Sequence, residues 1–330
     1  MKGPALPQAR GPLSAGVIAT LLERGPLSSP AADVDPLGED LQLALYLTYE
    51  LHYRGFDGVS EDWEWDPDLL RVRGEMERVF LATLRDKTAG GQDVAGELEN
   101  LLVEPVDGEG LSYHLRDGGE RRQVREYVAH RSIYHLKEAD PHAWVIPRLQ
   151  GRSKAALVAV EFDEFGGGRA ERMHAQLFAD LMEELELDPS YGAYLNIAPA
   201  EMLAVVNMMS MFGLHRSLRG AMVGHFAAAE ITTPPSARRI DQGLRRLGVG
   251  PRGTLFYTEH IEADAVHEQV LRHDVIGDLL EREPYLTRDV VFGIQATDWL
   301  EGRFGEHVLG RWRSGRTSLL GPLPGRTEVR

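Results

Sequence analysis

The sequence contains no cysteine among its 330 residues. This absence excludes disulfide bonds, cysteine nucleophiles, thiolate zinc sites, iron–sulfur clusters and thiolate-bound haem. A metal bound by this chain must therefore take nitrogen and oxygen ligands. The sequence also has neither a GxGxxG motif nor a GxxxxGK motif followed by Ser or Thr, so it gives no support to a nucleotide cofactor. If the chain carries out redox chemistry, its electrons must come from elsewhere.

Positive charge is scarce, and long apolar runs are absent. The chain has 36 Lys and Arg against 51 Asp and Glu, which gives a net charge of −15. Such a charge disfavours nucleic acid or an anionic membrane as the main partner, because both require a basic surface. No apolar run approaches the ~20 residues that span a bilayer, and the N-terminal stretch lacks the apolar core of a signal peptide. We therefore expect a cytoplasmic protein without a membrane partner.

What the sequence has instead is helical periodicity. Hydrophobic residues make up 43% of the chain, which is ample for a buried core. They recur at helical spacing without convincing strand alternation, so the pattern predicts an all-α protein packed as a bundle. We divide it into an irregular arm (1–38), an N-terminal helical extension (39–115), a main helical domain (116–313) and a flexible tail (314–330). The extension could pack on the main domain or mediate a homodimer.

The run from Thr258 to His267 aims three candidate metal ligands at one point. At about 100° per residue, His260, Asp264 and His267 fall within an arc of roughly 60° on a helix. Two imidazoles and a carboxylate on one face suit iron, manganese or zinc. The alternative is a polar helix whose histidines are solvated or capped.

Four further candidates lie beside apolar stretches of the main domain. Helical bundles hold pairs of metal ions by pointing carboxylates and histidines inward from facing helices. The candidates at such positions are Glu138, Glu164, His174 and Glu230. Each alone has an ordinary explanation, as a helix cap, an exposed helix end or a histidine packed in the core. Glu230 comes just before the Thr-Thr-Pro-Pro segment 232–235, where we expect its helix to stop.

Taken together, these side chains resemble a known ligand pattern. A Glu, then a Glu and a His ten residues apart, then a Glu, then H-x-x-x-D-x-x-H is similar to the pattern of the haem-oxygenase-like di-iron oxidases, a family of iron-containing redox enzymes. The segments KEADPHAW, DEFGGGRAERMH, GHFAAAE and EHIEADAVHEQV also resemble family signatures, and they lie within about residues 120–282. The resemblance implies a haem-oxygenase-like helical bundle that binds two iron ions. The implied ligands are Glu138, Glu164, His174, Glu230, His260, Asp264 and His267.

One ligand position is open between two glutamates. Glu171 and His174 form an E-x-x-H pair on one helix face, which is common in ferritin-like and some haem-oxygenase-like sites. Glu164 lies about 80° from His174 on an ideal helix, and the three glycines at 166–168 could distort the helix enough to bring it in. We favour Glu164 and keep Glu171 as its substitute.

Neighbouring side chains could support these ligands. Hydrogen bonds that the ring N–H groups donate to nearby carboxylates would fix the tautomers of the three histidines. The candidates for this role are Asp163, Glu259, Glu262 and Glu268. His225, five residues before Glu230, could be a pocket acid or base, or a structural group.

The resemblance implies an enzyme, an O2-dependent non-haem di-iron oxidase or oxygenase that acts on a small molecule in secondary metabolism. Members of the family carry out N-oxygenation of amines or guanidines, oxidative decarboxylation of fatty acids, or oxidative cleavage of amino acids. O2 would be the cosubstrate, and an external electron donor is a candidate partner. Two alternatives stay open: a helical zinc or manganese hydrolase, which needs no redox partner, and a non-catalytic metal-binding relative whose ligands do not converge.

Overall fold

The computed structural model describes residues 3–23, 25, 27–103 and 108–324, except for the side chains of residues 262–266. Within these ranges the chain forms helices, turns and connecting segments but no strand. The fold is therefore all-α, as the periodicity predicts. No helix in the described ranges is long and apolar enough to cross a bilayer.

The helices range from single turns to the 28 residues of the longest. In chain order, the α-helices of the described ranges are α1 (Pro12–Leu21), α2 (Glu39–Glu50), α3 (Pro67–Lys87), α4 (Val94–Leu101), α5 (Leu111–Asp117), α6 (Arg121–His135), α7 (Asp140–Ala143), α8 (Gly151–Glu164), α9 (His174–Glu184), α10 (Ala200–Leu214), α11 (Arg219–Arg246), α12 (Pro251–Gln269), α13 (Asp278–Arg282) and α14 (Thr287–Arg313). A π-helical segment, Val270–Gly277, joins α12 to α13 without a break.

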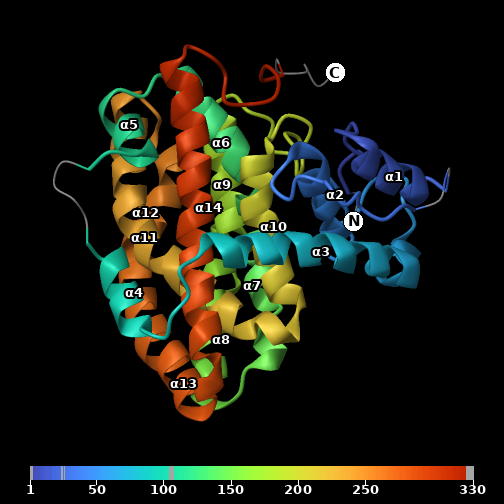
Figure 1. The fold of residues 1–330 in the computed structure, drawn as a ribbon. Helices are drawn as coiled ribbons and strands as arrows, with labels where there is room; N and C mark the ends of the chain where they lie inside the picture. The colour runs from blue at the N-terminus through green and yellow to red at the C-terminus, as the bar shows by residue number, and fades with distance from the viewer. Residues whose placement is uncertain (1–2, 24, 26, 104–107, 325–330) are drawn as a thin grey trace.

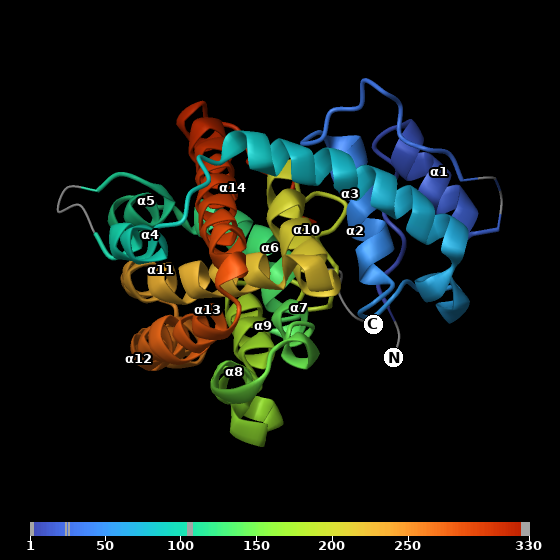
Figure 2. The same ribbon diagram turned by 60° about the horizontal axis from the view of Figure 1, so that its bottom comes forward.

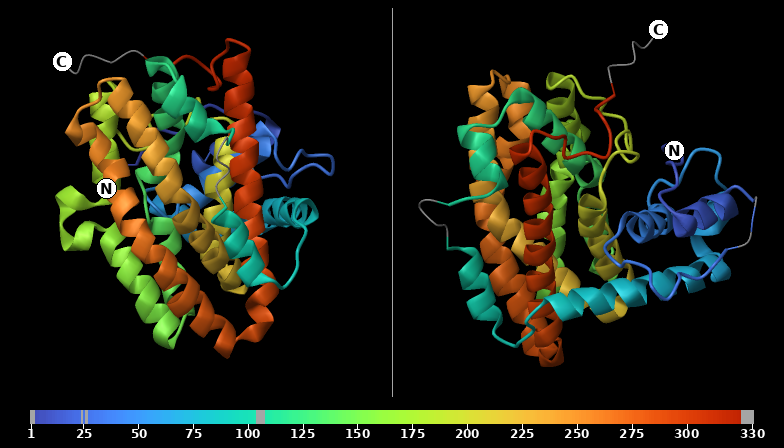
Figure 3. Two further views of the ribbon diagram at one scale, coloured as in Figure 1. Left: turned by 90° about the vertical axis from the view of Figure 1, so that its left-hand side faces the viewer. Right: turned by 45° about the horizontal axis from the view of Figure 1, so that its top comes forward.

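The longer helices of the main domain run side by side as a bundle (Figure 1). α11 lies between α12 and α14 and packs on both, while α9 packs on α12 and α6, and α10 packs on α14. α5 and α4 cover the outer side of α11 and α14, and α8 packs on the π-helical segment near one end (Figure 3). Apolar side chains from these helices merge into one continuous core. The bundle therefore surrounds its interior with helices that face one another.

The N-terminal helices stand to one side of the bundle (Figure 2). α2 packs against α1 and α10, and α3 runs from this side to α14, beyond which the chain leads on to α4. A buried ion pair joins α2 to the bundle, because Nζ of Lys137 lies 2.9 Å from Oε2 of Glu50. Tyr191 also donates its hydroxyl to Glu50, 2.7 Å from Oε1. The extension is helical, and these contacts hold it against the bundle.

The arm, predicted to be irregular, contains a helix. α1 begins at Pro12, whose ring fixes a backbone φ suited to the first helical turn. The N–H groups of Leu13 and Ser14 donate to the carboxylate of Asp40 at 2.9 Å and 2.7 Å. The prediction for 1–38 is wrong in this segment, because the group that caps α1 comes from α2 and cannot be read from the local sequence.

The predicted tail (314–330) is docked over part of its length. Ser318 and Leu319 are 1% and 2% exposed. The N–H and the hydroxyl of Ser318 both donate to Glu126 at 2.9 Å, so the prediction of flexibility is wrong here. Residues 325–330 lie outside the described residues. The boundary predicted at 115/116 also falls inside α5, which packs on α11.

α11 continues through two prolines at the place where the sequence predicts a helix end. Pro234 and Pro235 lie inside the helix and lack the N–H groups that would bond to the preceding turn. Ile231 before them and Ala237 after them are both buried, so packing on each side outweighs the lost hydrogen bonds. The prediction of an end is wrong, and Glu230 lies within the helix at 7% exposure.

α11 and α14 approach each other at glycines. A Cβ added at Gly224 would lie 2.1 Å from the carbonyl oxygen of Val290, and one at Gly293 would lie 2.0 Å from that of Ala221. No side chain fits at such distances, so both positions require glycine. We call this contact, made by Gly224 and Gly293, the glycine clasp. It fixes the separation of the two helices.

Candidate metal centre

Breaks in the helices bring together the first group of candidate ligands. Glu138 lies just after α6, Glu164 is the last residue of α8, and His174 is the first residue of α9. Between α8 and α9, the three glycines at 166–168 have φ values of 72°, 62° and 80°. Glycine adopts this left-handed region readily and other residues do not, so the chain can reverse sharply there. The turn brings Glu164 and His174 together.

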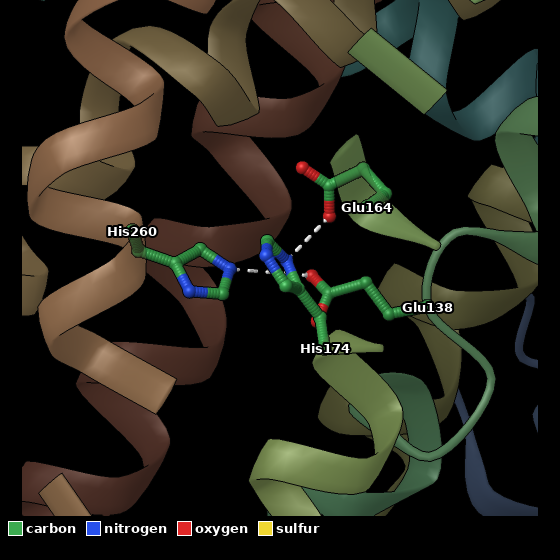
Figure 4. A group of neighbouring side chains, drawn as sticks. All are labelled: Glu138, Glu164, His174 and His260. Carbon is green, nitrogen blue, oxygen red and sulfur yellow. Dashed lines mark ion pairs between the residues drawn. The ribbon is translucent and has the colours of Figure 1, made fainter. Parts of the chain in front are cut away.

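Glu138, Glu164, His174 and His260 point toward one another (Figure 4). One donor atom from each lies within 4.8 Å of the others. Nδ1 of His174 is 2.7 Å from Oε2 of Glu164, and Nε2 of His260 is 3.9 Å from Oε1 of Glu138. All four residues are buried. Two carboxylates and two imidazoles that converge away from water form a donor set suited to a transition metal.

Glu164 also belongs to a second group, with Glu230 and His267. Their donor atoms again lie within 4.8 Å of one another. Nδ1 of His267 is 3.1 Å from Oε2 of Glu230 and 3.8 Å from Oε1 of Glu164. One oxygen of Glu164 therefore faces His174 while the other faces His267, and this carboxylate lies between the two groups.

Six of the seven ligands predicted from the sequence lie in these two groups. The structure brings together Glu138, Glu164, His174, Glu230, His260 and His267. The side chain of Asp264 lies outside the described residues. Glu171 is exposed on the 3-10 turn Ala170–Arg172 and belongs to neither group. The helix expected around residues 258–267 is α12, which carries His260 to the first group and His267 to the second.

One of the candidate orienting carboxylates contacts a ligand. Oδ2 of Asp163 lies 3.2 Å from Nε2 of His267. Burial acts against the charged form of this ring, but hydrogen bonds to Glu230 and Asp163 outweigh it and raise the pKa of His267 to about 9. The ring is therefore protonated at neutral pH. A metal ion would have to displace one ring proton, because imidazole coordinates a metal in its neutral form. Glu259 and Glu268 pair with arginines instead, and the side chain of Glu262 lies outside the described residues.

A second buried acidic side chain lies on α8 besides Glu164, and it was not among the predicted residues. Glu161 is 2% exposed, and neither of its carboxylate oxygens has a hydrogen-bond partner among the described residues. Burial, and then the negative charges of Glu164 and Glu230, raise the pKa of Glu161 to about 9. A bound cation would stabilise the ionised form of these carboxyl groups and supply the partner that they lack, so the residues present fit a metal centre. Its spacing from Leu157 and Glu164, at i+4 and i−3, could have revealed it.

A histidine next to the first group also went unpredicted. Nδ1 of His135, the last residue of α6, lies 2.9 Å from Oε2 of Glu138. Burial lowers the pKa of His135, although Glu138 opposes this shift. The contact occupies one oxygen of Glu138 and leaves the other toward His260. His135 therefore orients a ligand without joining the group itself.

A cavity of about 510 Å³ lies beside the two groups. Its walls come mainly from α6, α11, α12 and α14, and Glu138, Glu230 and His260 are among its lining residues. A cavity of this size holds a small organic molecule. The candidate metal centre is thus open to a possible substrate site on one side.

Two further buried histidines line this cavity, and their hydrogen bonds fix their tautomers. Thr297 donates its hydroxyl to the carbonyl of Gly293, so its oxygen accepts from Nδ1 of His225, 2.8 Å away. Nε2 of His225 then accepts from Nε2 of His142 at 3.2 Å. Burial lowers the pKa of both rings, that of His225 to about 4, so both are neutral. Nδ1 of His142 is left as an acceptor without a hydrogen-bond partner among the described residues.

The helical fold and the buried cluster of carboxylates and histidines agree with a family assignment. A sequence model of a family described as iron-containing redox enzymes matches residues 125–302, more than half of the chain. The chain belongs to this family of haem-oxygenase-like proteins, which confirms the resemblance seen in the sequence.

A particular relative supports the same assignment. Nitrosourea synthase from Streptomyces achromogenes subsp. streptozoticus is 25% identical over 225 residues. The match covers 64% of this chain but 46% of that protein, so the chain spans less than half of that relative's length. The two findings together support an oxidoreductase that contains iron.

Proposed function

We propose that the protein is an O2-dependent non-haem di-iron oxidase or oxygenase that acts on a small molecule. The proposal depends most on Glu164, whose two oxygens face different histidines in two buried groups. A carboxylate in that position can bridge two metal ions. Membership of an iron-containing family and the nitrogen and oxygen ligands both favour iron.

The two groups would divide the ligands between the two ions. One ion would be held by Glu138, Glu164, His174 and His260, and the other by Glu164, Glu230 and His267. Asp264 is the proposed seventh ligand. When bound, the irons would supply electrons for the reduction of O2 and coordination positions for O2 and substrate. The chain itself contributes orientation, since His135 holds Glu138 and Asp163 holds His267.

We place the substrate in the cavity beside these groups. Its reacting end would approach Glu138, Glu230 and His260, which line the cavity. The reactions that we propose are N-oxygenation of an amine, or oxidative C–C cleavage of an amino or fatty acid. The name of the relative, nitrosourea synthase, favours chemistry at nitrogen. An external donor would supply the electrons, because the sequence has no nucleotide-binding motif.

Anaerobic titration with Fe(II) tests the proposal. We expect about two tightly bound irons per chain, followed by an O2-dependent absorption when the loaded protein is mixed with O2 and a candidate amine or amino acid. Binding of fewer than about one iron, even in excess Fe(II), contradicts the di-iron site. A lack of any O2-dependent absorption with all candidate substrates contradicts the oxygenase.

The same protein distinguishes the two alternatives. A zinc or manganese hydrolase would turn over its substrate without consuming O2, and metal analysis with an oxygen electrode would show this. A non-catalytic relative would bind metal without any O2 consumption. The convergence of six predicted ligands argues against the second alternative, because its ligands should not meet.

A further inference from the structure

A buried ion pair lies in the wall of the cavity, apart from the candidate metal centre. Arg131 on α6 donates from Nη1 and Nη2 to the two carboxylate oxygens of Glu301 on α14, at 2.8 Å and 2.7 Å. Both residues line the cavity. Such a two-point contact holds the carboxylate in a fixed orientation. Neither residue contributes to the two groups of ligands.

Arg131 is in no position to bind a substrate anion. Both of its terminal nitrogens are used by Glu301, and its guanidinium lies over the rings of Tyr127 and Phe304, at 5.4 Å and 4.7 Å from their centroids. Its side chain is 16% exposed, whereas that of Glu301 is 34% exposed. The carboxylate is therefore the accessible partner. Arg131 outweighs the effect of burial and lowers the pKa of Glu301, so the carboxylate is ionised at neutral pH.

The charged groups of the cavity point to the same kind of ligand, because its lining residues include four glutamates and two arginines. Arg239, the other arginine among the lining residues, donates to Ser112 and stacks on Tyr113 at 4.1 Å. The cavity thus presents the ionised carboxylate of Glu301, and both arginines are engaged with protein groups. A ligand that donates hydrogen bonds and carries positive charge complements this wall.

We propose that Glu301 binds a cationic nitrogen group of the substrate, a primary ammonium or a guanidinium, and that Arg131 is the residue that positions Glu301. The inference rests on the proposed function, because it takes the cavity as the substrate site. It names the substrate class as a small organic cation. Its charged group would lie at Glu301 while another part extends toward Glu138 and Glu230.

Calorimetry with two probes of equal chain length tests the proposal. We would measure the binding of n-hexylammonium and 1-hexanol to the Fe(II)-loaded protein under nitrogen, since the two differ only in the charged group. The native protein should bind the ammonium at least about tenfold more tightly than the alcohol, and Glu301→Gln should remove that preference while leaving hexanol binding unchanged. Equal binding of the two probes, or a preference that survives in Glu301→Gln, overturns the proposal.

Two further variants keep the test decisive. Glu301→Gln leaves Arg131 without its counter-charge and could impair folding, so the double variant Arg131→Gln/Glu301→Gln removes the pair as a unit and should lose the preference too. Glu306→Gln, at an exposed lining residue, is the matched control and should keep it. Failure of the native protein to bind iron would refute the proposed function. The binding of hexylammonium and hexanol can still be compared on the iron-free protein, so the two failures are distinguishable.

Discussion

Two buried glutamates of this protein stand in opposite surroundings. Glu50 is 0% exposed and is fully engaged, with Lys137 at 2.9 Å from one oxygen and the hydroxyl of Tyr191 at 2.7 Å and 2.8 Å from both. Glu161 is 2% exposed and has no hydrogen-bond partner on either oxygen among the described residues. Glu50 and its partners join the extension to the bundle, and Glu161 borders the candidate metal centre.

The different surroundings of Glu50 and Glu161 correspond to different roles, one in stabilising the fold and one at the candidate metal centre. A buried carboxylate that is paired and hydrogen-bonded costs little to keep, whereas one that lacks partners destabilises the fold. The chain places the costly carboxylates where six potential ligands converge. A buried carboxyl group without partners therefore marks the place where a cation is expected, and a paired one marks a contact between parts of the fold.

The largest effect is expected at the carboxylate shared by the two groups. Glu164→Gln should lower bound iron from about two per chain to fewer than one, because an amide cannot replace a bridging carboxylate. Iron bound after anaerobic loading and desalting measures this. Glu171→Gln, an exposed neighbour, is the control and should bind as much iron as the native protein. The reverse result would make Glu171 the ligand.

The next effect is on stability, at the paired carboxylate. Glu50→Gln should lower the free energy of unfolding by about 3–5 kcal/mol, because it leaves Lys137 charged and buried without its partner. Urea denaturation followed by circular dichroism measures the loss. Glu61→Gln, at an exposed position of the same extension, should change it by less than about 0.5 kcal/mol. Equal losses in the two variants would contradict the role given to the buried pair.

The same substitution at the unpaired carboxylate should have the opposite sign. Because the pKa of Glu161 is raised to about 9, the folded protein keeps a proton that the unfolded chain releases above about pH 4.5. The free energy of unfolding therefore falls as the pH rises from about 4.5 to about 9. In the metal-free protein, Glu161→Gln should gain about 1–3 kcal/mol at pH 7, and the gain should grow between pH 5 and pH 8. Urea denaturation between pH 5 and pH 8 measures this gain. A change in unfolding free energy that does not depend on pH, or a loss of stability, would contradict the prediction.

A smaller effect is expected from one hydrogen-bond donor of the paired cluster. Tyr191→Phe removes the hydroxyl that donates to Glu50 and should cost about 1–2 kcal/mol in unfolding free energy. The loss should be smaller in the Glu50→Gln background, because the amide oxygen of Gln is a neutral acceptor. A double-mutant cycle in urea measures the coupling, and a coupling near zero would show that Tyr191 acts independently of Glu50.

The sequence predicted the parts of this molecule that depend on local pattern. Helical periodicity predicted an all-α fold, and the spacing of His260 and His267 placed both on the inner face of one helix. The resemblance to a known family supplied Glu138 and Glu230, which lack a strong local signal.

Features that depend on distant contacts could not be predicted. The helix α1 requires a cap from Asp40, and the continuity of α11 across Pro234 and Pro235 requires packing on both of its sides. Glu161 had a readable spacing, but its lack of partners emerges only when the bundle closes around it. The pairing of Arg131 with Glu301 joins residues 170 positions apart.

The glycine clasp limits how this protein could change its substrate during evolution. Since a Cβ at Gly224 or Gly293 would meet the backbone of the opposite helix, the spacing of α11 and α14, two of the helices that line the cavity, cannot be adjusted by substitution there. A descendant that acts on a longer or shorter molecule would have to vary residues elsewhere in the cavity wall, such as Ser112 and Leu309. Adaptation to a substrate of another length is therefore expected at side chains away from the glycine clasp.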